Sequence, residues 1–197
     1  MRIIGGLHRS RKILGPEGAL TTRPITDRVK QSLFDRLRVR GYVDSGTAID
    51  IFCGTGSLGL EALSRGVDHC TFIERDRSVR GLLEKNIASL KLADQALVLA
   101  IDAVAGGGGS SGEAWIQRLP RQPVSLIFCD PPYAMTQDPQ DMARLCEMMS
   151  LIAPIAEPDA LLMLRTEEYT PAPALDAWTG PESHKHGSMQ VHLYIRA

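Results

Sequence analysis

The sequence predicts an α/β fold built on a doubly wound, largely parallel sheet. Short apolar runs alternate along the chain with amphipathic helical stretches, which is the pattern of parallel strands joined by crossover helices. A glycine-rich segment, 53–59, follows the first long apolar run, and three later runs each end in an acidic residue. Because the carboxyl ends of parallel strands meet at one edge of a sheet, we expect these features to share a crevice.

The composition is that of one globular domain with a small extension. The chain has 197 residues, of which 44% are hydrophobic, enough for a substantial core. It contains no apolar run of membrane length and no signal-peptide pattern, so we expect a cytoplasmic protein without membrane contacts. The four cysteines lack the paired spacing of zinc sites or disulfide scaffolds, which favours free thiols and no bound metal. We expect a monomer.

Positive charge is concentrated at the amino-terminal end. Residues 1–40 hold ten Lys or Arg against three Asp or Glu, a balance of +7, whereas the rest of the chain holds 12 against 20, a balance of −8. We therefore divide the chain into a basic extension, 1–40, and a main domain, 41–197. A basic arm on an acidic body indicates a nucleic-acid contact at one end, although an exposed, solvated helix and turn explains the charge equally well. The candidate RNA-binding residues are Arg9, Arg11, Lys12, Arg23 and Arg28.

The extension is expected to form a β-hairpin followed by a helix. Two short strands, 2–6 and 11–14, flank a turn that contains Gly and Arg. Thr26 is a good N-cap for the helix, and Asp27 in the first turn suits the positive end of the helix dipole. Spacing of three and four residues puts the apolar side chains on one face and leaves the basic ones largely on the others. The apolar set is Val29, Leu33, Phe34 and Leu37, and the basic set is Arg28, Lys30, Arg36 and Arg38.

The first strand of the main domain, 47–52, leads into the glycine-rich segment and then into a helix. A strand, a glycine loop and a helix in this order form a cradle for a nucleotide or nucleoside. Gly54 and Gly56 let the backbone approach a ligand, Gly59 permits close packing of the helix on the strand, and Asp50 lies just before the loop. Taken alone, the pattern G-x-G-x-x-G is a weak signal, because it often marks only a tight turn.

Acidic residues end the next two strands. Glu74 follows the strand 70–73, about 20 residues after the glycine loop, where a carboxylate can bind both hydroxyls of a ribose. Asp102 follows the strand 97–101, after a helix over 76–92. It can accept a hydrogen bond from the exocyclic amine of an adenine in the same crevice; alternatively, it only caps the next segment.

The fourth strand, 124–128, ends in Cys129-Asp130-Pro131-Pro132-Tyr133. The two prolines fix their own φ angles and keep the preceding residues out of the helical region, so a stiff, extended corner follows the strand. This corner offers the Asp130 carboxylate and the Pro131 carbonyl as acceptors beside the ring of Tyr133. A flat ring that bears an NH2 group fits this set, because the ring stacks on the phenol and both N–H groups find oxygens. The competing interpretation is that the prolines merely end a strand and Tyr133 packs on the surface.

The remaining segments complete the alternation. A flexible stretch rich in Gly and Ser, 106–112, is expected to be a surface loop before a short helix. A helix over 141–151 follows, and then two strands, 160–164 and 190–195. Three histidines have no metal-like partners and are expected to be ordinary surface or sheet residues: His184, His186 and His192.

Two kinds of cofactor chemistry use such a cradle. A dinucleotide dehydrogenase needs a second nucleotide half and a substrate domain, and the chain has no length for either. An S-adenosylmethionine enzyme fits better, because its ligand combines adenine, ribose and a methionine tail with a cationic sulfonium that carboxylates favour. Asp50, Glu74, Asp102 and Asp130 provide such carboxylates. The sequence therefore favours a methyltransferase.

Five stretches carry a resemblance to a known family. They are Arg2-Ile3-Ile4-Gly5-Gly6, Arg23-Pro24 with Thr26-Asp27-Arg28-Val29, Leu33-Phe34, the stretch 50–66 that contains Asp50-x-Phe52-x-Gly54-x-Gly56, and Asp130-Pro131-Pro132-Tyr133. They closely resemble the RsmD family of bacterial 16S ribosomal RNA guanine-N2 methyltransferases. The resemblance covers nearly the whole chain. It implies a class I methyltransferase, with a Rossmann-like sheet of seven strands whose last strand is antiparallel and a small amino-terminal hairpin and helix.

The resemblance also implies a reaction and a site. S-adenosyl-L-methionine would methylate the exocyclic N2 of one guanine, guanine 966 in the family, in 16S rRNA or an assembling small ribosomal subunit. The implied catalytic residues are Asp130, Pro131 and Tyr133. The implied cofactor-binding residues are Asp50, Phe52, Gly54, Gly56, Glu74, Asp102, Ala103 and Asp130. The sequence departs from the family pattern at the stretch 106–112 and at Lys30-Gln31, where the family usually has a basic–acidic pair.

Other functions stay open at this point. An adenine-N6 or cytosine-N4 nucleic-acid methyltransferase uses the same kind of corner, although such DNA enzymes usually carry a separate target-recognition domain. A small-molecule or protein-glutamine methyltransferase would leave the basic arm unexplained. A non-catalytic RNA-binding assembly factor with a vestigial cofactor site is the third alternative, and the intact Gly54, Gly56, Glu74 and Asp130 argue against it.

Overall fold

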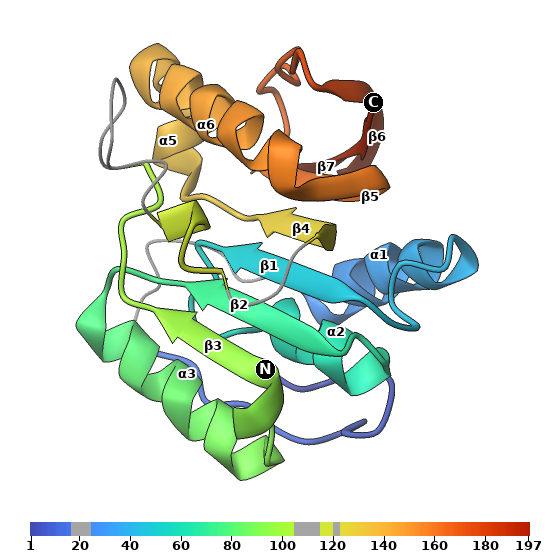
Figure 1. Ribbon diagram of the computed structural model, residues 1–197, viewed down its shortest axis with the longest axis vertical. Coiled ribbons are helices and arrows are strands. Elements are labelled where there is room, and N and C mark those ends of the chain that lie inside the picture. Colours follow the sequence, from blue (N-terminus) through green and yellow to red (C-terminus); the bar gives the residue numbers. More distant parts are fainter. Residues whose placement is uncertain (17–24, 105–114, 120–122) are drawn as a thin grey trace.

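The computed structural model describes residues 1–16, 25–104, 115–119 and 123–197. Its strands form a seven-stranded sheet in the order β3-β2-β1-β4-β5-β7-β6 (Figure 1). The strands are β1 Thr47–Ile51, β2 His69–Ile73, β3 Ala96–Leu99, β4 Val124–Cys129, β5 Ala156–Glu167, β6 Trp178–His186 and β7 Met189–Arg196. The pairs among β1 to β5 are parallel, and β7 runs antiparallel to both of its neighbours. The predicted seven-stranded sheet with an antiparallel last strand is confirmed.

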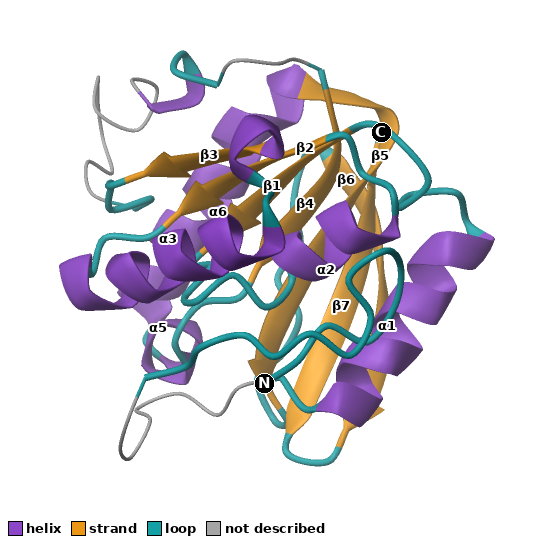
Figure 2. Cartoon of the chain, turned by 90° about the horizontal axis from the view of Figure 1, so that it is seen from below, coloured by secondary structure: helices purple, strands orange, loops and turns teal. Residues whose placement is uncertain are grey.

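Helices cover both faces of this sheet (Figure 2). The described helices are α1 Asp27–Val39, α2 Gly59–Arg65, α3 Arg77–Leu90, α5 Tyr133–Gln137 and α6 Pro139–Ile152, with short 3-10 turns at Ala93–Gln95 and Ala153–Ile155. One apolar cluster holds α1, α2 and α3, and a second holds α6. Successive residues of β1, Ala48 and Ile49, belong to different clusters, because side chains alternate between the two faces of a strand.

Helix α1 follows the prediction except at one residue. Its N-cap Thr26 accepts a hydrogen bond from the Val29 N–H, and its apolar face is buried, with the ring of Phe34 5.7 Å from that of Phe128 in β4. The prediction that Lys30 lies on an outer face is wrong, because this side chain is 1% exposed. Its ammonium group lies 3.4 Å from a carboxylate oxygen of Glu61 in α2, so a buried charge partner draws the lysine inward.

The predicted amino-terminal hairpin is present in a short form, with one antiparallel bridge between Arg2 and Lys12 and backbone hydrogen bonds of 2.9–3.1 Å between residues 1–3 and 10–13. The segment is also held on α2 and α3, through hydrogen bonds that side chains accept from its backbone N–H groups. Glu61 accepts from Ile4 and Gly5, Ser64 accepts from His8, and Asn86 accepts from Leu14. The boundary after residue 40 stays a prediction. Apolar residues of α1 and of the first sixteen residues belong to the same core cluster as those of α2 and α3.

Strand β6 and the short helix α5 are not predicted by the residue pattern, and β6 is the longer of the two. It is mostly polar and contains Gly180 and Pro181, which usually mark turns. Its position at the edge of the sheet explains the composition, because edge strands tolerate proline and charged residues. The three histidines lie in β6 and β7, as predicted, and His192 is buried between Thr166 and Ser183.

Two further findings concern only the described part of the chain. None of its helices has the length and apolarity to cross a membrane. It contains no cluster of three or more His, Cys, Asp or Glu side chains arranged to hold a metal ion. The predicted loop 106–112 lies outside the described residues.

Candidate functional site

A cavity of about 350 Å3 lies at the carboxyl edge of the parallel strands. Its volume is within the range of small-molecule sites. Its wall is built from the segments that follow β1, β2, β3 and β4, together with the end of β5. Six of the eight predicted cofactor-binding residues line it: Phe52, Gly54, Glu74, Asp102, Ala103 and Asp130. The expectation that these strand ends share one crevice is therefore met.

The glycine loop gives the cavity a bare stretch of backbone. Phe52 and Gly54 have left-handed φ angles of 58° and 56°, so the chain turns sharply after β1. A Cβ on Gly54 would meet no atom within 4 Å and would enter open space. The Gly54 N–H donates to a Glu74 carboxylate oxygen over 3.1 Å, which ties the loop to the end of β2. A ligand can therefore lie directly against the backbone at residue 54.

Asp50 and Gly56, also predicted to bind the cofactor, are not among the lining residues. The buried carboxylate of Asp50 accepts the N–H of Gly59, the first residue of α2, over 2.8 Å. Burial is the main reason that the pKa of Asp50 is raised to about 8, and neighbouring carboxylates add to it. At Gly56 a Cβ would lie 2.5 Å from Leu83 Cδ1, and at Gly59 it would overlap the ring of Phe72 in β2. Asp50 and Gly56 therefore support the conformation of the glycine loop without lining the cavity. The predicted close packing at Gly59 is confirmed.

Glu74 and Asp102 present carboxylates that the backbone already orients. Glu74 accepts the Asp76 N–H over 2.8 Å on the oxygen that does not bind the loop. Asp102 accepts from the Arg75 guanidinium over 2.7 Å and from the Val104 N–H over 3.2 Å. The second bond is the capping role that the sequence offered as the alternative for Asp102. A bond from Asp102 to an adenine stays a prediction.

The predicted corner follows β4. The Asp130 N–H donates to the Ile51 carbonyl over 3.2 Å, which joins the corner to β1, and the 17% exposed side chain of Asp130 faces the cavity. Pro132 has an extended conformation, with φ −54° and ψ 139°, and its carbonyl accepts the Met135 N–H in α5. Pro131 therefore lies buried between the end of the strand and the start of a helix. The expected stiff, extended corner is present.

Arg165 is a site residue that the sequence analysis missed. The predicted strand ended at Leu164, whereas β5 continues to Glu167 and carries Arg165 into the cavity wall. Its guanidinium forms an ion pair with the Asp130 carboxylate and lies 5.4 Å from the centroid of the Tyr133 ring. Tyr133 itself is half-buried at the start of α5 and is not among the lining residues. A charged residue directly after an apolar strand, as at Glu74 and Asp130, was the available signal.

Burial and a neighbouring positive charge have opposite effects on the pKa of Asp130. Burial raises the pKa of this carboxyl, and the Arg165 guanidinium acts against that rise. The two groups are close because β4 and β5 are adjacent and parallel: Cys129 pairs with Leu164, Asp130 directly follows β4, and Arg165 is the next residue of β5. The pKa of Asp130 stays above its ordinary value, and Arg165 reduces the tendency of this buried carboxyl to take up a proton.

The amino-terminal region supplies a second part of the wall that was not predicted. Met1, Pro16 and Ile25 line the cavity together with Ser57 of the glycine loop. No pattern in the sequence indicates this contact, because it depends on how the first residues pack on α2. The same packing makes Met1 and Pro16 part of the candidate site.

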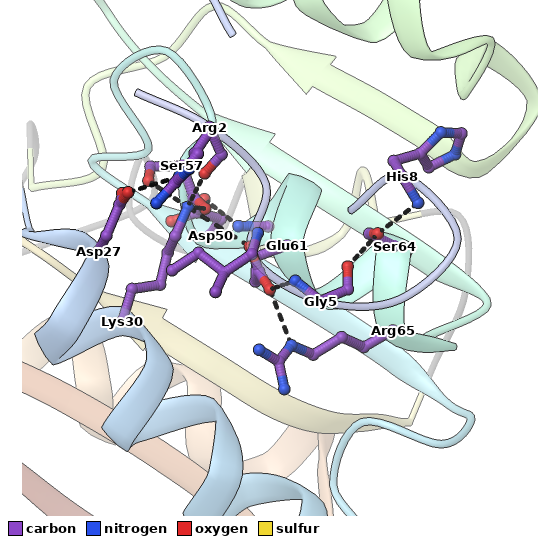
Figure 3. Close-up of polar contacts among 12 residues, drawn as sticks. Arg2, Gly5, His8, Asp27, Lys30, Asp50, Ser57, Glu61, Ser64 and Arg65 are labelled. Atoms are coloured by element: carbon purple, nitrogen blue, oxygen red, sulfur yellow. Dashed lines mark hydrogen bonds and ion pairs between the residues drawn. The ribbon is translucent and has the colours of Figure 1, made fainter. Parts of the chain in front are cut away.

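A buried polar network fixes that packing (Figure 3). The Lys30 ammonium donates to the Arg2 carbonyl over 2.7 Å and to the Ser57 hydroxyl over 3.3 Å, so it joins the amino-terminal segment to the glycine loop. Glu61 accepts from two backbone N–H groups of the segment and from Arg65 Nε over 2.8 Å. Burial lowers the pKa of Lys30, and the Glu61 carboxylate opposes this.

The described candidate RNA-binding residues lie on the amino-terminal segment and on α1. Arg9, Arg11 and Lys12 are exposed on the amino-terminal segment, and Arg28 is exposed on α1. Arg11 also donates to the Ser89 carbonyl at the end of α3 over 3.1 Å. Arg23 lies outside the described residues. Contact of these residues with RNA stays a prediction.

The wall suits S-adenosylmethionine in three respects. The open space at Gly54 accepts a ligand against the loop, and apolar side chains offer a surface for a ring. These side chains are Ile73, Val79 and Ile101. Carboxylates at positions 74, 102 and 130 can meet hydroxyl groups, an amine and a cationic sulfonium.

Known proteins resemble this chain over its full length. It is 35% identical to Ribosomal RNA small subunit methyltransferase D of Haemophilus influenzae over 198 residues, covering 98% of this chain and 93% of that protein. It is 32% identical to the Escherichia coli K12 protein of the same name, covering 100% of this chain and 90% of that protein.

Solved structures agree with these relatives. The structure of yhhF from Escherichia coli has a TM-score of 0.75 at 32% identity and covers 100% of this chain and 97% of its own. A protein from Thermus thermophilus has a TM-score of 0.74 at 29% identity, covering 98% of each chain. The fold is that of class I methyltransferases. A family model described as Conserved hypothetical protein 95 matches residues 1–195, and the chain therefore belongs to this family, the RsmD family.

Proposed function

We propose that this protein methylates the exocyclic N2 of one guanine in 16S rRNA, guanine 966 in the family, with S-adenosyl-L-methionine as methyl donor. The observation that carries the proposal is that Asp130 lines the same cavity as Gly54, Glu74 and Asp102. An acceptor for an amino group therefore lies beside the part of the site that suits the cofactor. The relatives named as small-subunit rRNA methyltransferases support RNA as the substrate.

Each part of the corner has a proposed role. The Asp130 carboxylate and the Pro131 carbonyl accept the two N–H bonds of the target amine and turn its lone pair toward the methyl group. The ring of Tyr133 replaces the stacking that the base loses when it leaves its helix. S-adenosylmethionine supplies an electrophilic methyl group on its sulfonium, so the protein contributes mainly position and electrostatics. A strong base is not needed, because the amine can lose its proton after transfer.

The proposed cofactor contacts follow the cavity wall. Glu74 would hold the ribose hydroxyls, Asp102 and Ala103 the adenine, and Phe52 and Gly54 the adjoining part of the ligand. Asp50 and Gly56 would act by keeping the loop in shape. The exposed arginines and Lys12 of the amino-terminal region would hold phosphates, so binding weakens as salt rises. We propose a monomer that needs no metal and works in the cytoplasm on 16S rRNA or an assembling small subunit.

Methyl transfer from labelled S-adenosylmethionine to small subunits purified from cells that lack the protein tests this proposal. Mass mapping of the product should find one added methyl group on a guanine. Asp130→Ala should reduce transfer by about 1,000-fold or more, while cofactor affinity stays within about tenfold, because the residue acts on the amine. Methylation of an adenine or cytosine would contradict the guanine assignment. Cofactor binding without transfer to any RNA would indicate a non-catalytic assembly factor.

A further inference from the structure

The ion pair between Arg165 and Asp130 has no role in the mechanism described so far. The Arg165 side chain is 4% exposed and the Asp130 side chain 17% exposed, so both charges are largely withdrawn from water. Buried ion pairs contribute little net stability compared with apolar side chains of the same size, because both charges must be desolvated. A buried pair in the wall of a ligand cavity is therefore better explained by what it does to the site.

The charges around Asp130 show why it needs a cation. Asp130 is buried at the end of β4, and burial raises the pKa of its carboxyl. Its charge in turn raises the pKa of the Asp50 carboxyl on β1. Among the described residues of the cavity wall, the cationic side chains are Arg75 and Arg165, and Arg75 is paired with the carboxylate after β3. Arg165 from β5 is thus the positive group that faces Asp130. Without it, burial alone would act on the carboxyl and would favour its protonated form.

Arg165 also contacts the second part of the corner. Its guanidinium carbon lies 5.4 Å from the centroid of the Tyr133 ring, within the range of a cation–π contact. A guanidinium is planar, so it can hold a carboxylate through its N–H groups while a face lies near an aromatic ring. One side chain therefore sets the relative position of the carboxylate and the ring.

We infer that Arg165 is a positioning residue for methyl transfer, which fixes the Asp130 side chain, favours its carboxylate form and holds the Tyr133 ring beside it. The inference rests on the proposed function, because Asp130 is the group through which Arg165 acts. An ionised carboxylate accepts at both oxygens, so one oxygen can bind Arg165 while the other accepts from the target amine. A protonated carboxyl would replace one of these acceptors by an O–H donor, so an N–H of Arg165 or of the amine would lose its acceptor.

Two substitutions separate the charge of Arg165 from its shape. Arg165→Met keeps much of the apolar stem without the charge, and Arg165→Lys keeps the charge without the planar fork. Arg144→Met, at an exposed arginine on α6, is the matched control. The measurements are single-turnover methyl transfer to small subunits between pH 5 and 9, cofactor affinity by calorimetry, and the thermal midpoint of unfolding. A carbon-13 NMR titration of the Asp130 carboxyl, assigned with Asp130→Asn, adds a readout that does not depend on activity.

The expected pattern for Arg165→Met is a loss of transfer rate of about 100-fold, with cofactor affinity within about threefold of wild type. The acid limb of its pH–rate profile and the NMR titration of Asp130 should both move to higher pH. Arg165→Lys should restore the position of the acid limb and part of the rate. Arg144→Met should behave as wild type.

Several outcomes would overturn the inference. An unchanged rate and pH profile in Arg165→Met would do so, as would a lower thermal midpoint with an unchanged profile, which would make Arg165 a purely structural residue. If Arg165→Met does not fold, the Lys variant decides. An Asp130 titration as in wild type and a transfer rate approaching that of wild type support the inference, and a transfer rate far below wild type contradicts it. Full activity of Asp130→Ala, or no transfer by the wild type, is a failure of the proposed function itself. Loss of activity in Asp130→Ala with a normal Arg165→Met overturns the inference alone.

Discussion

Replacement of Glu61 by glutamine should destabilise the protein strongly, although it changes only one group of atoms. The Glu61 carboxylate is fully buried and receives four donors: the N–H groups of Ile4 and Gly5, the Arg65 guanidinium and the Lys30 ammonium. Glutamine has one acceptor oxygen, and its NH2 group would face a donor. The Lys30 charge would also lose its compensating partner.

The cost follows from these losses. Breaking a buried ion pair by removing one partner costs about 3–5 kcal/mol, because an uncompensated charge stays buried. An unpaired backbone N–H adds about 1–3 kcal/mol if no water reaches it. We take about 3–5 kcal/mol as the expected loss, since local opening of the amino-terminal segment would relieve part of the strain. At about 2–4 °C per kcal/mol for a protein of this size, the thermal midpoint should fall by about 6–20 °C.

Chemical denaturation and hydrogen exchange check this result. The free energy of unfolding should fall as stated, and the amides of Ile4 and Gly5 should exchange faster than in wild type. Glu84→Gln is the matched control, because Glu84 is 60% exposed and lies 3.9 Å from Arg80, so its loss should stay within about 0.5 kcal/mol. Adding Lys30→Met to Glu61→Gln should recover part of the loss. Equal stability of the Glu61 and Glu84 variants would refute the reasoning.

Three further predictions concern the site. Gly54→Ala should lower the free energy of unfolding by about 1 kcal/mol, because φ at residue 54 is 56°. It should also weaken cofactor binding in calorimetry, because the new methyl group enters the open space where the ligand would lie. An unchanged affinity would show that Gly54 does not contact the ligand. The Asp50 pKa, raised to about 8 in the folded protein, means that the folded state keeps a proton that the unfolded state releases, so stability falls as pH rises from about 4 to 8. Asp50→Asn should remove up to about 1.4 kcal/mol of this fall per pH unit in denaturation curves, and an identical slope would contradict the shift. Arg9→Ala combined with Arg11→Ala should lower RNA affinity and reduce the salt slope by about 0.7–0.9 per lost phosphate contact, whereas Arg144→Ala should not; an unchanged slope in the pair would remove the arm from the interface.

The sequence predicted the parts of the site that depend on order along the chain. Apolar runs located the strands of the parallel core, and the acidic residue after each run marked the edge where the cavity lies. The proline pair fixed the corner because its effect on the backbone is local. These signals need no knowledge of neighbouring strands.

What escaped prediction depends on contacts between distant segments. Lys30 satisfies the spacing of an outer face, and only the buried Glu61 brings it inward. Arg165 follows its apolar run as Glu74 and Asp130 do, but its contact with Asp130 depends on the pairing of β5 with β4. Strand β6 is polar because it lies at an edge, so neither its alternation nor its proline marks it as a strand.

The position of β7 between β5 and β6 makes the sheet dependent on residues that are synthesised after both neighbouring strands. Until residues 189–196 have left the ribosome, β5 has an open edge and β6 has no partner within the sheet. A premature stop codon that removes these residues would delete an interior strand and not a dispensable tail. It would leave backbone N–H and C=O groups of β5 unpaired, the condition that favours aggregation between chains.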